Sequence, residues 1–149
     1  MGGAISSFDT EFENLTITAD GNGFGVFAGY RHNLNGSLFI EGELFAASLN
    51  GETNTGNTDF DTFVAVTLGV GTYFSETVSG LIFAGVANLK TDNATNGSAS
   101  DDGTVLGLGI NYDFTPQQTA GVRYYRTSGE GTFGDVDTDT LELRYAFRF

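Results

Sequence analysis

The chain has 149 residues and a formal net charge of −13, with 19 acidic and 6 basic residues. This balance excludes a nucleic-acid-binding role, because phosphates demand clustered lysine and arginine. The absence of cysteine excludes a disulfide framework, a cysteine metal site and a thiol nucleophile. No run of about 18 apolar residues occurs, so no transmembrane helix is expected. The length suits one domain over residues 1–149.

Apolar and polar residues alternate along most of the chain, which is typical of strands with two different faces. In chain order, the alternation predicts strands at 3–12, 23–33, 37–49, 62–74, 79–90, 104–114, 119–128 and 139–149. Short connections are expected at 33–36, 75–77 and 115–118, and long ones near 13–22, 50–61, 91–103 and 129–138. Tilted strands of about ten residues are long enough to cross a bilayer.

One face of these strands combines glycines with charges of both signs. Its charged members are, in chain order, Arg31, Glu41, Glu43, Arg123, Glu142 and Arg144. Glycines relieve crowding inside a narrow barrel, and buried charges need partners. The pattern therefore predicts an interior ion-pair network, with the aliphatic face turned toward lipid. The alternative, a solvated face of a soluble barrel, is disfavoured because Lys90 is the only lysine.

A membrane-spanning sheet must close on itself, because lipid cannot satisfy the backbone groups of an open edge. We therefore expect an all-β fold, an eight-stranded antiparallel up-and-down transmembrane β-barrel with short periplasmic turns and longer extracellular loops. Aromatic residues recur where the even-numbered strands end, which predicts an aromatic girdle at the periplasmic interface. Its members are Tyr30, Phe74, Tyr112 and Phe114.

The C-terminal strand carries a family resemblance. Apolar or aromatic residues occupy every second position up to the last one, at Leu141, Leu143, Tyr145, Phe147 and Phe149. This series resembles the terminal-strand signature of bacterial outer-membrane proteins, which the barrel assembly machinery recognises. Glu142 fits the polar position of that signal, whereas Arg144 stands where many members have glycine. The resemblance implies that these five residues form an assembly signal.

In length and connection pattern, the whole chain is similar to the OmpA/OmpX-like eight-stranded barrels of the porin family. Segments 23–31 and 37–44 look like adjacent strands of that family. The resemblance implies the outer membrane of a Gram-negative bacterium. The N-terminus has no charged region followed by an apolar run, so we expect that any signal peptide has been removed.

Few residues suggest a catalytic or metal-binding site. His32, the only histidine, is expected at the periplasmic end of its strand, the wrong end for a Ser-His-Asp site acting on lipid at the outer rim. The acidic run 135–139 lacks the glycine and terminal glutamate of a calcium-binding EF-hand loop. No catalytic residue, cofactor or metal is therefore expected.

Acidic residues gather in the segments expected to form long loops, where no lysine or arginine occurs. They are Asp20, Glu52, Asp59, Asp61, Asp92, Asp101, Asp102, Glu130, Asp135, Asp137 and Asp139. A negative outer rim is expected, which would repel anions or attract cations, or simply keep the loops solvated. Lys90 and Arg126, near the outer ends of their strands, are expected either to contact lipid headgroups or to snorkel.

These observations favour a non-enzymatic outer-membrane barrel with a structural or surface-interaction role. The expected partners are outer-membrane lipid and lipopolysaccharide, the barrel assembly machinery and an external macromolecule, with the chain itself monomeric. The alternatives are a narrow channel for ions or small solutes and a soluble lipid-binding barrel of the lipocalin kind. A natural mature domain and a designed barrel would share all these features.

Overall fold

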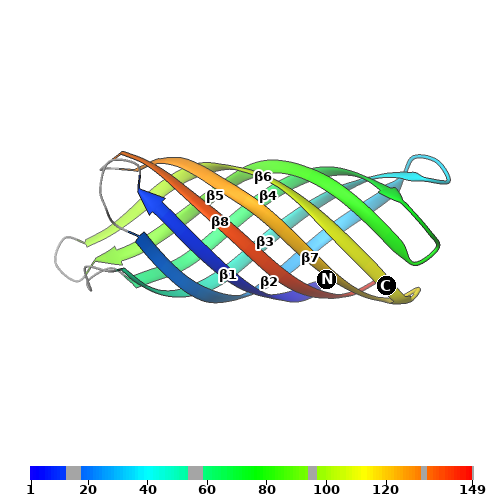
Figure 1. Cartoon of the computed structure of the whole chain (residues 1–149), viewed down its shortest axis with the longest axis horizontal. Helices are drawn as coiled ribbons and strands as arrows, with labels where there is room; N and C mark the ends of the chain where they lie inside the picture. Colours follow the sequence, from blue (N-terminus) through cyan, green and yellow to red (C-terminus); the bar gives the residue numbers. More distant parts are fainter. Residues whose placement is uncertain (13–17, 54–58, 94–96, 132–133, 149) are drawn as a thin grey trace.

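A computed structural model shows eight antiparallel strands in a closed ring, which confirms the expected barrel (Figure 1). It describes residues 1–12, 18–53, 59–93, 97–131 and 134–148, with side chains at 1–3, 21–48, 62–88, 102–129 and 137–148. The strands are β1 (Gly2–Phe12), β2 (Thr18–Asn33), β3 (Leu38–Thr53), β4 (Asp59–Tyr73), β5 (Val78–Asn93), β6 (Gly97–Thr115), β7 (Gln118–Gly131) and β8 (Gly134–Phe147). Within the described ranges, no helix is long and apolar enough to cross a membrane.

The strands extend well beyond their expected outer ends. β6 begins at Gly97, seven residues before the predicted position 104, and β3 continues to Thr53 instead of ending at 49. The segments expected to form long loops are thus strand over half of their length or more, and the expected bounds of these loops were wrong. Many acidic residues assigned to loops, such as Asp20 and Glu52, instead pair within the sheet. A strand that extends past the lipid meets water on its outer side, so its apolar alternation disappears.

The pairing of the strands sets the shape of the interior. One row of paired residues runs around the ring and returns to β1 ten residues further along, at Phe12 instead of Gly2. The row passes through Gly2, Phe27, Phe45, Ala65, Ala87, Gly103, Gly129, Val136 and Phe12. Such a stagger tilts the strands by about 35–45°, and an eight-stranded barrel is then just wide enough for side chains.

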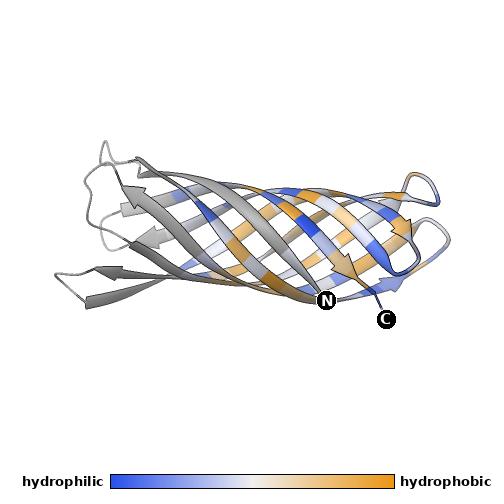
Figure 2. Cartoon of the chain, turned by 90° about the horizontal axis from the view of Figure 1, so that it is seen from below, coloured by the Kyte–Doolittle hydropathy of each residue, from blue (hydrophilic) through white to orange (hydrophobic). Residues whose placement is uncertain are grey.

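Hydrophobic and hydrophilic residues alternate along the strands (Figure 2), and the two sides of the barrel wall differ in the sense expected for a membrane protein. Outward-facing Leu106 and Ile82 are 69% and 68% exposed, whereas inward-facing Arg123 and Glu142 are 5% and 2% exposed. A soluble barrel would place its apolar face inside. The medium around this wall is therefore lipid, which argues against the lipocalin alternative.

Tight turns and both chain ends lie at the same end of the barrel (Figure 1). In each turn one side-chain oxygen, that of Asn35, Ser75 or Thr115, accepts hydrogen bonds from two backbone N–H groups that follow it in the chain. Such local bonds are the usual reason why Asn, Ser and Thr favour turns. Short turns mark the periplasmic end of bacterial barrels.

Candidate functional site

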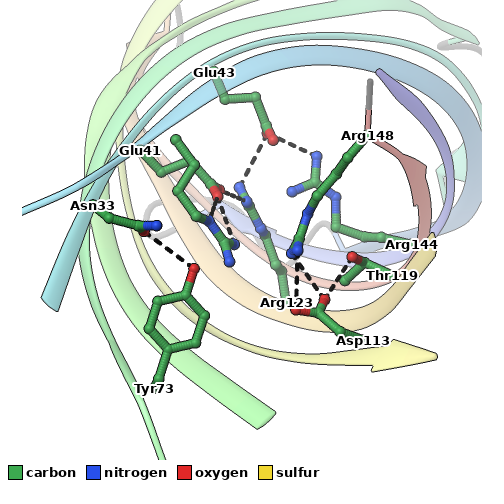
Figure 3. A network of polar contacts seen from close by, with 10 residues as sticks. Asn33, Glu41, Glu43, Tyr73, Asp113, Thr119, Arg123, Arg144 and Arg148 are labelled. Carbon is green, nitrogen blue, oxygen red and sulfur yellow. Dashed lines mark hydrogen bonds and ion pairs between the residues drawn. The ribbon is translucent and has the colours of Figure 1, made fainter. Parts of the chain in front are cut away.

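A carboxylate bound by two guanidiniums lies at the centre of the barrel interior (Figure 3). Glu43 Oε1 accepts a hydrogen bond from Arg123 Nη1 at 3.0 Å and another from Arg144 Nη2 at 2.7 Å. All three side chains are almost fully buried. Because Glu43 lies on β3 and the arginines on β7 and β8, these bonds cross the lumen.

The network continues toward the periplasmic end through Glu41. Its Oε2 accepts from Arg31 Nε at 2.8 Å, and its Oε1 accepts from Arg123 Nη2 at 2.5 Å. Arg123 therefore joins Glu41 to Glu43, whose side chains point the same way from β3. Arg31 and Glu41 are also direct register partners on β2 and β3, so their proximity follows from strand pairing.

A third carboxylate completes the network on β8. Arg144 Nε lies 2.6 Å from Glu142 Oε1, and the hydroxyl of Tyr125 lies 3.4 Å from Glu142 Oε2. The six residues predicted for the interior are thus joined in one cluster of three arginines and three glutamates. Because the guanidiniums and carboxylates are equal in number, their charges compensate one another, which makes it possible to bury all six side chains.

The guanidiniums of the network also lie on aromatic rings. The Arg144 Cζ atom is 3.6 Å from the ring centroid of Phe27, and the Arg31 Cζ atom is 4.0 Å from that of Phe39. A cation over an aromatic face is attracted by about 0.5–2 kcal/mol, more when water is excluded. The rings therefore add a second contact that holds these two arginines in place beside their carboxylates.

An aromatic layer lies next to the charged network and was missed by the sequence analysis. Phe63 contacts Phe45 and Tyr125 with ring centroids 5.9 Å and 6.4 Å apart, and Phe83 contacts Tyr125 at 6.2 Å. The cavity that remains where this layer meets the network measures only about 20 Å³. At this level, the described side chains fill the lumen. Phe45 and Tyr125 share the strand parity of Glu43 and Arg123, a signal that could have placed these two rings inside the barrel.

On the periplasmic side of the network, the interior opens into a vestibule of about 260 Å³, lined by the charged network and by apolar residues such as Phe27 and Ala146. At its mouth, Arg148 binds both oxygens of Asp113 at 2.9 Å and 2.8 Å, and Thr119 donates to Asp113 Oδ1 at 2.6 Å (Figure 3). Asp113 was not among the predicted members of the network. The vestibule admits water from one end and ends at the Arg–Glu cluster.

The residues predicted for the periplasmic girdle all lie exposed on the outer wall near the turns: Tyr30, Phe74, Tyr112 and Phe114. The described members of the predicted assembly signal also face outward along β8: Leu141, Leu143, Tyr145 and Phe147. Phe149 lies outside the described residues. His32 is exposed beside the first turn, at the end opposite the outer rim.

On the outer wall, the guanidinium of Arg126 already forms an ion pair with the carboxylate of Asp139. Its Nε and Nη2 bind the two oxygens of Asp139 at 2.9 Å and 2.7 Å, and the Tyr124 hydroxyl donates to the same carboxylate at 2.9 Å. A lipid phosphate would have to compete with Asp139 for this guanidinium. The side chain of Lys90, the other predicted headgroup contact, lies outside the described residues.

A closed antiparallel ring with an apolar outer wall and a charged interior defines a transmembrane β-barrel. The family model for the outer membrane protein beta-barrel domain matches residues 1–149, and the chain belongs to this family. It is therefore a bacterial outer-membrane protein. No curated protein sequence matches the chain significantly.

Solved structures share the fold over almost the whole chain. Ail, the attachment invasion locus protein of Yersinia pestis, is 20% identical, with a TM-score of 0.63 and coverage of 99% of this chain and 97% of its own. Neisserial surface protein A is 15% identical, with a TM-score of 0.70 and coverage of 99% and 95%. At these identities the likeness concerns the fold alone.

Proposed function

We propose that this protein is a non-enzymatic, non-conducting barrel that serves the outer membrane as a structural and surface-interaction protein. The observation that carries the proposal is the filled lumen. An ion entering the vestibule meets the cross-lumen pairs of Glu43 with Arg123 and Arg144, and behind them an aromatic layer that leaves about 20 Å³. A conducting path would have to break buried ion pairs and displace aromatic rings.

Recordings in planar lipid bilayers test this proposal. The refolded protein, checked as a fast-migrating unboiled band on a denaturing gel, is expected to show no steady ohmic conductance. Steady conductance that Glu43→Gln alters, but that Glu76→Gln in an exposed turn does not, would contradict the proposal. That result would establish the narrow-channel alternative.

The outer end supports the surface-interaction part of the proposal. In register, Asp20 of β2 pairs with Glu52 of β3, and Asp9 of β1 pairs with both Asp20 and Asp139. Like charges directly opposite one another destabilise a sheet. Asp139 is already paired with Arg126, but no described cation is the register partner of the other three positions, Asp9, Asp20 and Glu52. This row at the water-exposed end is best explained by a positively charged partner, so we propose a basic external macromolecule.

The comparison with Ail sharpens this expectation. The structure of Ail has also been determined in complex with the heparin analogue sucrose octasulfate. An acidic outer end would repel such a polyanion. We therefore expect cells displaying this protein to bind polylysine but not heparin, with binding that weakens as salt rises. The paired change Asp20→Asn and Glu52→Gln should reduce polylysine binding, whereas Glu76→Gln at the periplasmic end should not. Heparin binding, or polylysine binding unaffected by the paired change, would refute the basic partner.

We also propose that the outward-facing series on β8 is the segment read by the barrel assembly machinery, and that the folded chain is a monomer in lipid. A closed ring has no free edge that requires a partner. Tyr145→Ala and Phe147→Ala should slow assembly by purified machinery in proteoliposomes more than Glu76→Gln does. Equal assembly rates for all three variants would remove this role.

A further inference from the structure

The periplasmic vestibule is lined by more guanidiniums than carboxylates (Figure 3). Its charged side chains are those of Arg31, Arg123, Arg144, Arg148, Glu41 and Glu43. The two glutamates are each bound by two arginines. Asp113 and Glu142 bring the two charges to equal numbers, but neither belongs to the lining, and each is already bound by an arginine. The surface that meets the vestibule is therefore rich in N–H donors.

Several buried donors of this lining lack partners. Arg31 Nη1, Asn111 Nδ2 and Arg123 Nε have no hydrogen-bond partner among the described residues. A fourth nitrogen, Arg144 Nε, makes no hydrogen bond but lies 2.6 Å from Glu142 Oε1. Asn111 and Arg123 are only 7% and 5% exposed. Buried donors without a partner are costly, and a bound ion or water is a common reason for them. Because these atoms are all nitrogens, the missing partner is a hydrogen-bond acceptor.

The three unpaired donors belong to side chains that lie close together. Arg31 and Arg123 bind the two oxygens of one carboxylate, that of Glu41, so their guanidiniums are neighbours. The Arg123 side chain runs over Gly109 of β6, where a Cβ would lie 3.0 Å from Arg123 Cγ. Asn111 is the next residue on that face of β6, toward the periplasmic end. The amide and the two guanidiniums therefore border the same part of the vestibule.

We propose that the vestibule binds a small oxyanion of the phosphate type, held by Asn111 together with Arg31 and Arg123. A tetrahedral oxyanion offers a separate oxygen to each of these donors, and guanidiniums match its geometry. Gly121, the register partner of Asn111, leaves room beside the amide, since a Cβ there would lie 2.5 Å from Asn111 Oδ1. The volume of about 260 Å³ suits a small ion. Because the vestibule opens at the periplasmic end of the lumen, its occupant is a free anion of the periplasm and not a lipid headgroup.

Nuclear magnetic resonance in dodecyl maltoside micelles tests the site by titration with sodium phosphate, with sodium chloride at equal ionic strength as the control. Phosphate is expected to shift the amide signals of Asn111 and Gly121 in a saturable manner. Asn111→Leu keeps the shape of the side chain without its donor and should weaken this binding about tenfold, the effect of losing one hydrogen bond to a charged group. Thr127→Val is the matched control. It also removes an unpaired buried polar atom, but it lies beyond Tyr125 on β7, so it should leave phosphate binding unchanged.

Four results would overturn the proposal. Equal shifts with chloride would show a general response to salt. Saturable shifts with magnesium chloride but not with phosphate would show that the glutamates hold a cation. No saturable shift with any of these salts would mean that water alone supplies the missing acceptors. Unchanged phosphate binding by Asn111→Leu, with its folding verified by the unboiled gel band, would show that the amide does not contact the anion. If that variant does not fold, Asn111→Asp, which keeps the shape and adds a negative charge, should abolish phosphate binding, and unchanged binding would have the same meaning.

Discussion

Replacing Glu43 with glutamine removes one negative charge from the centre of the barrel and changes its shape very little. In the native protein its Oε1 accepts from Arg123 at 3.0 Å and from Arg144 at 2.7 Å. After the change, three buried arginines share the two carboxylates of Glu41 and Glu142. Breaking a buried pair from one side costs about 3–5 kcal/mol, because the remaining charge stays uncompensated.

The structure places Glu43→Gln at the lower end of that range. Arg123 keeps its contact with Glu41 at 2.5 Å, and Arg144 keeps its contact with Glu142 at 2.6 Å. Neither guanidinium is left without a carboxylate, so the excess charge is shared. We therefore expect the free energy of unfolding to fall by about 3 kcal/mol.

Urea titration in lipid vesicles measures this change. The chain has no tryptophan, so circular dichroism and the unboiled gel band are the suitable readouts of folding. Glu76→Gln, in an exposed turn, should stay within about 0.5 kcal/mol of the native protein. A loss below about 1 kcal/mol for Glu43→Gln would refute the reasoning, because it would mean that water already solvates the network.

Three further changes test other parts of the fold by the same titration. Gly71→Ala places a Cβ against the Phe39 ring and should cost about 1–3 kcal/mol, whereas Gly42→Ala meets nothing within 4 Å and should be nearly neutral; equal effects would contradict the packing argument. Phe63→Ala opens the aromatic layer and should cost about 3–5 kcal/mol, and a loss under 1 kcal/mol would mean that the layer is not tightly packed. Arg126→Ala breaks an exposed pair and should cost less than about 1 kcal/mol, so a larger loss would show a pair shielded from water.

The alternation of residues was sufficient to predict the class of fold and the side on which each strand residue lies. Along β3, Glu41 and Glu43 lie on the face opposite outward-facing Leu44. A water-exposed strand face usually carries lysines, and this chain has only one, so the charged residues in mid-strand indicated an interior position. This inference depends on local chemistry alone. The inward assignment of these residues therefore requires no knowledge of which strands face one another across the lumen.

The outer strand ends could not be predicted by the same reasoning. In β6, the segment Gly97–Gly103 is rich in Gly, Ser and Asp and has the composition of a loop. It is nevertheless paired with β5, Asn93 with Gly97 and Lys90 with Ser100. Above the membrane, the outer side of a strand meets water and loses its apolar alternation, so composition no longer distinguishes strand from loop.

The contacts across the lumen depend on the stagger of the barrel, which no local pattern reveals. Arg144 binds Glu43 from a position 101 residues away, and Arg123 binds it from a position 80 residues away. Parity showed that these side chains point inward, but their common level follows from the ten-residue return of the pairing row. Parity could likewise have placed aromatic residues inside the barrel, but it could not show that they meet in one layer.

The stagger also explains why charge and aromatic rings occur at adjoining levels of one lumen. Arg123 belongs to the charged network through Glu43, yet its guanidinium lies 4.8 Å from the ring of Phe83, which belongs to the aromatic layer through Tyr125. Each layer therefore positions the other, and neither can open alone. A lumen closed by two coupled layers leaves the two ends and the outer wall as the surfaces on which related barrels can acquire different partners.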